Sequence, residues 1–163
     1  MTQKMNENVN ESMAMELVTD VQSGLTGVGV NAFSNPASTA MYCSVITDGS
    51  MKSKASIYNA INSPDKKLDE CLGEVIELKD IIAHEVELID QNTGEVIRPL
   101  RTILVDTKGM TYQAVSVGVA NSLTRIFQIF GQPASWEHPI KVKPVKKKTN
   151  NGTNMVTLLE IIF

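Results

Sequence analysis

Hydrophobic and polar residues alternate along much of the second half of the chain, which indicates β-strands. The first predicted strand spans residues 72–90, and the polar pair Lys79-Asp80 requires a bend or bulge within it. The segment QNTGE then predicts a hairpin turn of the Asn/Gly type. The second predicted strand spans residues 95–106, where Pro99 requires an edge position or a bulge. After the turn TKG, residues 110–117 predict a third strand.

The period of the hydrophobic pattern then changes from two residues to 3.6, which predicts a helix over residues 118–131. Gly131 stands where a helix commonly ends. The apolar side of the helix is formed by Val119, Leu123, Ile126, Phe127 and Phe130, and we expect these side chains in the core. Two further strands are predicted over residues 139–148 and 154–163.

The order of these elements is three strands, a helix and two strands, which is the order of an OB-fold. We therefore predict a mainly β protein with some α: a five-stranded OB-type Greek-key barrel with a helix between strands 3 and 4. A generic α+β sandwich shares this order and stays an alternative. Residues 39–48 predict an additional strand and residues 52–62 a helix, so a strand-helix extension precedes the barrel.

The first part of the chain has a different composition, rich in Asn, Ser, Gly, Thr and Met. We predict that residues 1–36 form a flexible or partner-dependent arm, with a short amphipathic helix over residues 11–23. Residues 37–163 form the predicted binding domain. The polar, acidic N-terminus does not resemble a signal peptide, and no apolar run approaches the ~18 residues of a membrane span. We expect a soluble cytoplasmic protein without a membrane partner.

The net charge of −3 is unusual for a nucleic-acid-binding protein, but the charges are unevenly distributed. Residues 1–50 carry a net −4, whereas residues 137–163 carry five lysines against two glutamates, a net +3. Because salt screens each charge within about 10 Å, local density matters more than the total. The C-terminal part therefore remains compatible with phosphate binding.

OB-folds bind oligonucleotides across strands 2 and 3, between the loop that joins strands 1 and 2 and the loop that joins strands 4 and 5. Such binding uses cations that follow the phosphates and flat side chains on which bases stack. Tyr112 is the leading stacking candidate, and Trp136 and Tyr58 are weaker ones. The candidate nucleic-acid-binding residues are Arg98, Arg101, Lys108, Tyr112, Trp136, Lys141, Lys143, Lys146, Lys147 and Lys148.

Each candidate also has a structural interpretation. A lysine run in a hairpin is commonly a solvated loop that prevents edge pairing, although Lys141 and Lys143 alternate with apolar residues and so share one strand face. Arg98 and Arg101 differ in register, so at most one lies on the binding face unless Pro99 marks a bulge. Tyr112 equally suits a minor core, and Trp136 suits a cover over the barrel end.

The sequence contains no pattern typical of an enzyme, a metal site or a cofactor site. Glu85 and Glu87 alternate with apolar residues, as on the outward face of a strand, instead of forming a metal-binding acid cluster. Cys43 and Cys71 form no CxxC pair, and we expect two free buried thiols. Phosphate-loop, nucleophile-elbow and zinc-protease motifs are missing as well. We therefore predict a non-enzymatic protein.

Part of the chain resembles a known family. The stretch LRTILVDTKGMTYQAVSVGVANSLTRIFQIFGQPASW and the later TLLEI resemble small single-stranded-DNA-binding proteins of bacteriophages and mobile plasmids of Gram-positive bacteria. The resemblance covers about residues 55–163, includes SIYNAIN and LGEVIELKDIIAHEVEL, and is most specific in AVSVGVANSLTRIFQIFGQP. It implies an OB-fold and a role in protecting single-stranded DNA during replication or transfer. Typical bacterial single-stranded-DNA-binding proteins end in an acidic tail, whereas this sequence ends in LLEIIF, so partner recruitment through such a tail is not expected.

The expected partner is single-stranded DNA, bound largely without sequence preference. Duplex DNA or RNA binds more weakly in this interpretation, and replication or transfer proteins and a second copy are further expected partners. The alternative is an OB-type protein-interaction module of a replication or conjugation complex, which would use the methionines and the N-terminal arm as an adaptable apolar surface.

Overall fold

The computed structural model describes residues 25–27 and 40–163. The predicted helix over residues 11–23 and most of the predicted N-terminal arm lie outside these residues. The strands are β1 (Leu25–Gly27), β2 (Ala40–Cys43), β3 (Lys66–Lys67), β4 (Ile76–Glu85), β5 (Leu88–Ile89), β6 (Val96–Ile97), β7 (Leu100–Asp106), β8 (Thr111–Val115), β9 (Ile140–Lys148) and β10 (Met155–Ile161). The helices are α2 (Met51–Asn62) and α3 (Val117–Phe130), with short 3-10 turns η1 (Leu68–Cys71) and η2 (Pro133–Ser135).

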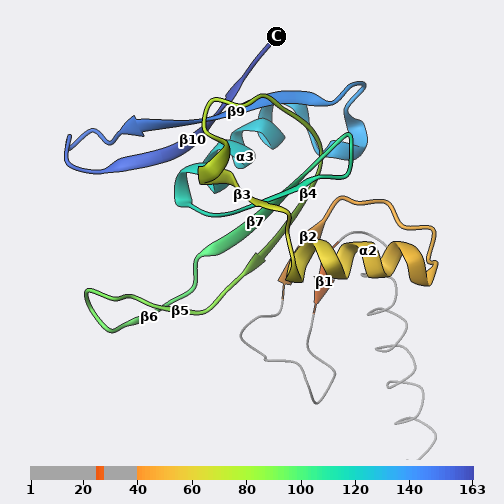
Figure 1. The fold of residues 1–163 in the computed structure, drawn as a ribbon, viewed down its shortest axis with the longest axis horizontal. Coiled ribbons are helices and arrows are strands. Elements are labelled where there is room, and N and C mark those ends of the chain that lie inside the picture. The colour runs from red at the N-terminus through yellow and green to blue at the C-terminus, as the bar shows by residue number, and fades with distance from the viewer. Residues whose placement is uncertain (1–24, 28–39) are drawn as a thin grey trace, which may run out of the picture.

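Eight of these strands form one curled sheet in which β4 is the central element (Figure 1). Strand β4 pairs with β7 along most of its length, from Leu78 opposite Asp106 to Glu85 opposite Leu100. Its first residues also pair with β9, and its last residues pair with β2. The register shifts between Leu78 and Asp80, so the predicted bulge is confirmed. The bulge lets one strand turn from one neighbour to another, which produces the curl.

The five predicted barrel strands lie in the spatial order β8-β7-β4-β9-β10. Among the described residues no ladder joins β8 to β10. The structure therefore confirms a mainly β fold with a curled sheet and two helices, and the five-stranded OB-type Greek-key barrel stays a prediction. Helix α3 lies against β10 instead: Ser122 Oγ accepts from the backbone N–H of Leu159 at 3.1 Å. Strand β8 pairs on its other side with the short parallel strand β3.

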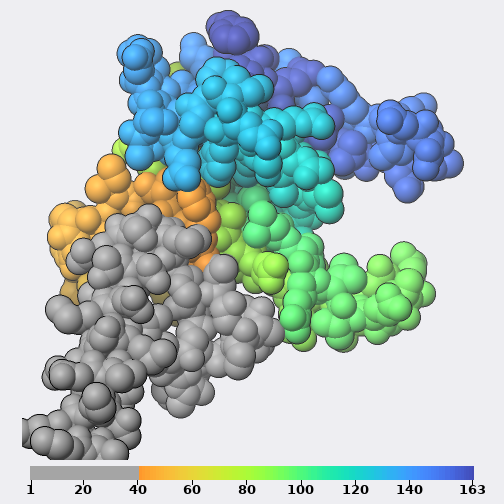
Figure 2. Space-filling model, turned by 180° about the vertical axis from the view of Figure 1, so that it is seen from behind, coloured from red at the N-terminus to blue at the C-terminus, as the bar shows by residue number. Residues whose placement is uncertain are grey.

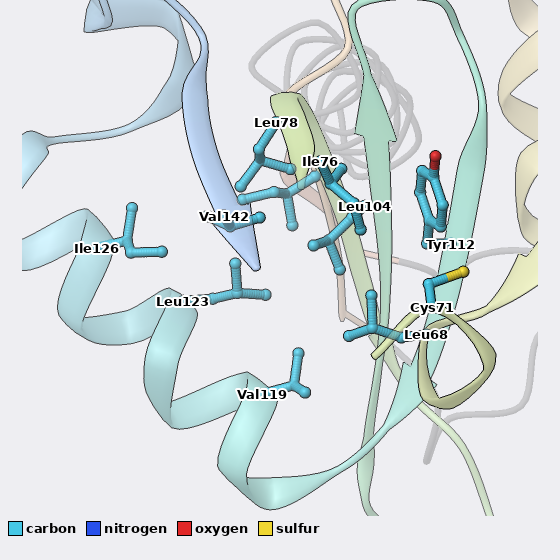
Figure 3. Packing of buried hydrophobic residues seen from close by; sticks show 11 residues of the cluster. Leu68, Cys71, Ile76, Leu78, Leu104, Tyr112, Val119, Leu123, Ile126 and Val142 are labelled. Atoms are coloured by element: carbon cyan, nitrogen blue, oxygen red, sulfur yellow. The ribbon is translucent and has the colours of Figure 1, made fainter. Parts of the chain in front are cut away.

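Apolar side chains pack on both faces of the sheet, in two separate clusters. The larger cluster joins α3 to the sheet and contains Leu68, Cys71, Ile76, Leu78, Ile81, Leu104, Tyr112, Val119, Leu123, Ile126 and Val142 (Figure 3). The smaller one contains Cys43, Ile82 and Ile103, against which Ile57, Ala60 and Ile61 of α2 pack. Helix α2 has no fully buried residue. It contacts the sheet through Ile57, Ala60 and Ile61 and through a hydrogen bond from Arg101 to the carbonyl of Ile61.

Gly118 is the place where α3 comes closest to β10. A Cβ at this position would clash with the carbonyl oxygen of Thr157 and with Cγ2 of Val156. The backbone on the β10 side cannot move without disturbing the β9–β10 ladder. Glycine is therefore required here for packing rather than for its backbone freedom.

We expect Gly118→Ala to lower the free energy of unfolding by about 1–3 kcal/mol, as overpacking does. This loss outweighs the roughly 1 kcal/mol by which alanine favours a helix over glycine. Urea unfolding followed by circular dichroism measures it. The control Asn121→Ala, at an exposed position of the same helix, should be neutral or slightly stabilising. Equal effects of the two substitutions would contradict this account of Gly118.

The sequence predictions for the remaining elements are mostly confirmed, with differences that have a physical cause. Helix α2, helix α3 and strands β9 and β10 agree with prediction to within a few residues. The predicted strand over residues 95–106 is divided into β6 and β7, because Pro99 lacks the N–H that a continuous ladder needs. Both cysteines are free and buried, as predicted. Phe130 is 39% exposed, so its predicted core position is wrong.

Candidate nucleic-acid interface

Two hairpin arms project from the same side of the molecule (Figure 1). We call residues 140–161, which form β9 and β10, the basic arm, and residues 85–98, which carry β5 and β6, the acidic arm. The space-filling view shows a hollow between the tips of the two arms (Figure 2). The segment that joins β4 to β7 and the loop that joins β9 to β10 therefore lie on the two sides of this hollow.

The basic arm carries five lysines and one glutamate, a net charge of +4. Strand β9 pairs antiparallel with β10, from Lys148 opposite Met155 to Val142 opposite Ile161. Successive side chains of a strand point to opposite faces. Lys146 and Lys148 therefore continue the face on which Val142 and Pro144 are buried, beyond the edge of the core. We call this the inner face of the basic arm.

Lys141, Lys143 and Lys147 lie on the opposite, outer face. Glu160 lies on the same face and accepts an ion pair from Lys147 Nζ at 2.9 Å and a longer one from Lys143 Nζ at 3.8 Å. The hydrogen bond from Lys147, together with both lysine charges, lowers the pKa of the Glu160 carboxyl. Lys146 and Lys148 form no ion pair with a described residue, and neither does the exposed Lys141 on the outer face. The inner face differs in that its two cations share it with no acidic residue of the arm.

Tyr112 lies in the larger core cluster, and its side chain is only 7% exposed. Its ring stands beside Cys71 and Leu68 (Figure 3). Its hydroxyl donates to Asp106 Oδ2 at 3.2 Å. Burial, together with the Asp106 carboxylate, raises the pKa of Tyr112 to about 12. The ring has no free face for a base, so the geometry favours the core interpretation that the sequence left open.

Arg101 connects α2 to the sheet through hydrogen bonds. Its Nη1 donates to the carbonyl of Ile61 at 2.7 Å, and its Nη2 donates to Gln113 Oε1 at 2.8 Å. The guanidinium also lies 3.5 Å from His84 Nε2. Burial, with Arg101 as a smaller contribution, lowers the pKa of His84. These bonds give Arg101 a structural role in holding α2 against the sheet.

The other candidates are dispersed over the molecule. Arg98 belongs to the acidic arm, where its Nε lies 3.9 Å from Glu87 Oε2. Lys108 is exposed in the turn between β7 and β8. Trp136 is half-buried against the larger core cluster and donates from Nε1 to the carbonyl of Gly131 at 2.9 Å. The structure brings together only the lysines of the basic arm.

An exposed aromatic residue lies elsewhere, on α2. Tyr58 is 67% exposed, and the helix carries Lys52 and Lys54 but no acidic residue. Lys54 and Tyr58 are four residues apart and so share a helix face. From the sequence, Tyr58 ranks below Tyr112 as a stacking candidate, whereas the structure leaves Tyr58 exposed and buries Tyr112. Helical spacing alone does not show which face of a lone helix is covered.

No group of three or more potential metal-binding side chains occurs among the described residues. Within the same residues, no helix has the length and apolarity needed to cross a membrane. The described surface therefore offers mainly exposed lysines beside the hollow, which can bind phosphates. Helix α2, which carries the exposed Tyr58, lies on another part of the molecule.

Comparison with known protein families agrees with this surface chemistry. The match defines the chain first as a phage DNA-binding protein. More particularly, the chain belongs to the phi29-type family described as phage single-stranded DNA-binding protein, which matches residues 36–160. No curated protein and no solved structure matches the chain. The protein is thus a phage single-stranded-DNA-binding protein that acts in phage replication, and the predicted function and family are confirmed.

Proposed function

We propose that the inner face of the basic arm holds the phosphates of single-stranded DNA beside the hollow, largely independently of base sequence. The observation that carries this proposal is the pair Lys146 and Lys148, two exposed cations on one strand face with no acidic partner among the described residues. A strand passing along this face would release counterions in proportion to the phosphates that it contacts. The acidic arm across the hollow disfavours phosphates on its own side.

The strand order supports an OB-type arrangement that is open between β8 and β10. In an OB-fold the loops that join strands 1 and 2 and strands 4 and 5 frame the oligonucleotide. Here the corresponding segments are the two arms on either side of the hollow (Figure 1).

Because phage DNA is replicated inside the infected cell, we place the action of the protein in the cytoplasm of the bacterial host. A role in plasmid transfer stays a prediction of the resemblance.

Helix α2 is the competing location for the DNA. Its exposed surface offers Lys54 beside the exposed ring of Tyr58, with Lys52 on another side of the helix. A cation and an aromatic ring are the two ingredients of sequence-tolerant binding. The inner face of the basic arm offers cations but none of the predicted stacking residues. Fluorescence distinguishes the two locations: stacking on Tyr58 would quench tyrosine fluorescence, whereas phosphate contact with the basic arm would not.

Fluorescence anisotropy of labelled 30-mers tests the proposal, with single-stranded DNA, duplex DNA and RNA compared at two salt concentrations. We expect tight, salt-sensitive binding of single-stranded DNA and weaker binding of the other two. Poly(dT) and mixed-sequence DNA should bind alike. A strong sequence preference, or a salt-independent affinity, would contradict a phosphate-led mode of binding.

A further inference from the structure

The acidic arm exposes apolar side chains on both of its faces. Leu88 pairs with Ile97, and Ile89 pairs with Val96. Between 40% and 65% of each of these side chains is exposed. Because neighbouring residues of a strand alternate in direction, each face of the arm carries one apolar pair. A projecting two-stranded hairpin is marginal on its own in water, and clustered exposed apolar residues mark an interaction surface.

The charges of this arm exclude nucleic acid as the partner of that surface. Glu85, Glu87, Asp90 and Glu95 stand against Arg98, a net charge of −3. Arg98 in turn lies 3.9 Å from Glu87. An apolar arm with this charge repels phosphates and attracts a surface that combines apolar and basic side chains.

The outer face of the basic arm is such a surface. It presents Lys141, Lys143 and Lys147 around Val145, and Glu160 is the one acidic residue that the arm itself places there. Glu77 of β4 stands opposite Lys141 on the same face, so the local net charge is +1 and the positive charge is concentrated toward Lys147. The inner face, with Lys146 and Lys148, is left free for DNA. The two faces of one hairpin can therefore serve two partners at the same time.

We propose that the acidic arm of one copy docks on the outer face of the basic arm of the next copy. The alternative symmetric contact would place two arms of net charge −3 against each other, which opposes association. A contact between two different surfaces joins the copies head to tail. Repeating it produces a chain of copies, unless the rotation that relates one copy to the next closes a ring. Such a chain of copies would cover single-stranded DNA cooperatively. The location of the DNA on the inner face rests on the proposed function, whereas the contact between copies does not.

A charge-swap experiment tests the contact. In the first variant, Glu87→Lys and Glu95→Lys reverse the acidic arm, and in the second, Lys141→Glu and Lys147→Glu reverse the outer face. Binding to long poly(dT) is compared with binding to an oligonucleotide that holds one protein. Like charges across the contact cost several kcal/mol, so each variant alone should lose cooperativity by about tenfold or more. An equimolar mixture should restore it, because each reversed surface then meets an opposite charge.

The binding of the short oligonucleotide separates this proposal from the proposed function. Both variants should bind it, since Lys146 and Lys148 are unchanged, and this binding also shows that they are folded. A third variant, Leu88→Asn with Ile97→Asn, tests the apolar part and should also reduce cooperativity. The proposal is overturned if the wild-type protein binds poly(dT) without cooperativity. It is equally overturned if the mixture stays non-cooperative while both variants bind the short oligonucleotide.

Discussion

Replacing Lys146 and Lys148 with alanine is expected to make single-stranded-DNA binding much less sensitive to salt. For single strands, each phosphate contact contributes about 0.7 to the slope of log affinity against log salt. Loss of two contacts should reduce the slope by about 1.4. Near 1 M salt the release of counterions no longer contributes, so the variant and the wild type should bind alike there. Over the tenfold change to 0.1 M salt, a slope lower by about 1.4 makes the variant bind roughly 25-fold more weakly than the wild type. Anisotropy titrations at four salt concentrations measure the slope.

The matched control removes the same charge from the competing location. Lys52→Ala with Lys54→Ala changes the net charge equally but alters only α2, where both lysines are exposed. We expect this pair to leave the slope within about 0.3 of the wild-type value, well below the 0.7 of one contact. The reverse result, with a large change for the α2 pair and none for the basic arm, would move the DNA site to α2 and to Tyr58.

Replacing Tyr112 with alanine is expected to be the most destabilising substitution considered. Removal of a buried aromatic ring leaves a cavity and lowers the free energy of unfolding by about 3–5 kcal/mol. Tyr112→Phe keeps the ring and loses only the hydrogen bond to Asp106, at a cost of about 0.5–1.5 kcal/mol. Urea unfolding measures both effects.

Two further measurements on Tyr112 distinguish a core residue from a stacking residue. Tyr112→Leu removes the aromatic ring but keeps an apolar side chain, so the folded variant should bind single-stranded DNA within twofold of the wild type. Stacking contributes about 1–3 kcal/mol per base, so a loss of fivefold or more with the fold retained would restore Tyr112 to the binding site.

The pKa of Tyr112 adds a dependence on pH. In the unfolded chain the phenol loses its proton near pH 10, whereas in the native protein it keeps the proton up to about pH 12. Unfolding at a pH between these values therefore releases a proton, and the free energy of unfolding falls as pH rises. Tyr112→Phe lacks this contribution, so the advantage of the wild type over Tyr112→Phe should shrink between pH 10 and 12. An unchanged difference would contradict the raised pKa.

The alternation of apolar and polar residues was sufficient to predict most elements. Strands β9 and β10 and helix α3 follow from the pattern alone, because each has one buried side and a turn signal at its end. The bulge at Lys79 was also predictable, because a polar interruption disturbs a ladder locally. At Pro99 an edge position or a bulge was predicted, and the missing N–H instead divides the strand into β6 and β7. The family resemblance identified single-stranded DNA as the ligand, which composition and a net charge of −3 did not suggest.

The sequence thus determined the strands, the helices and the class of ligand, because these depend on local patterns and on a specific phrase of residues. Whether Tyr112 faced solvent or the core was decided only by the tertiary structure, since both sides of the curled sheet are covered by different elements. The same holds for Arg101, whose partners Ile61 and Gln113 are distant in sequence. Strand alternation already divides the five lysines of β9 between two faces. Which of these faces is buried near Val142 and Pro144, and where along β9 it becomes exposed, was decided only by the packed molecule.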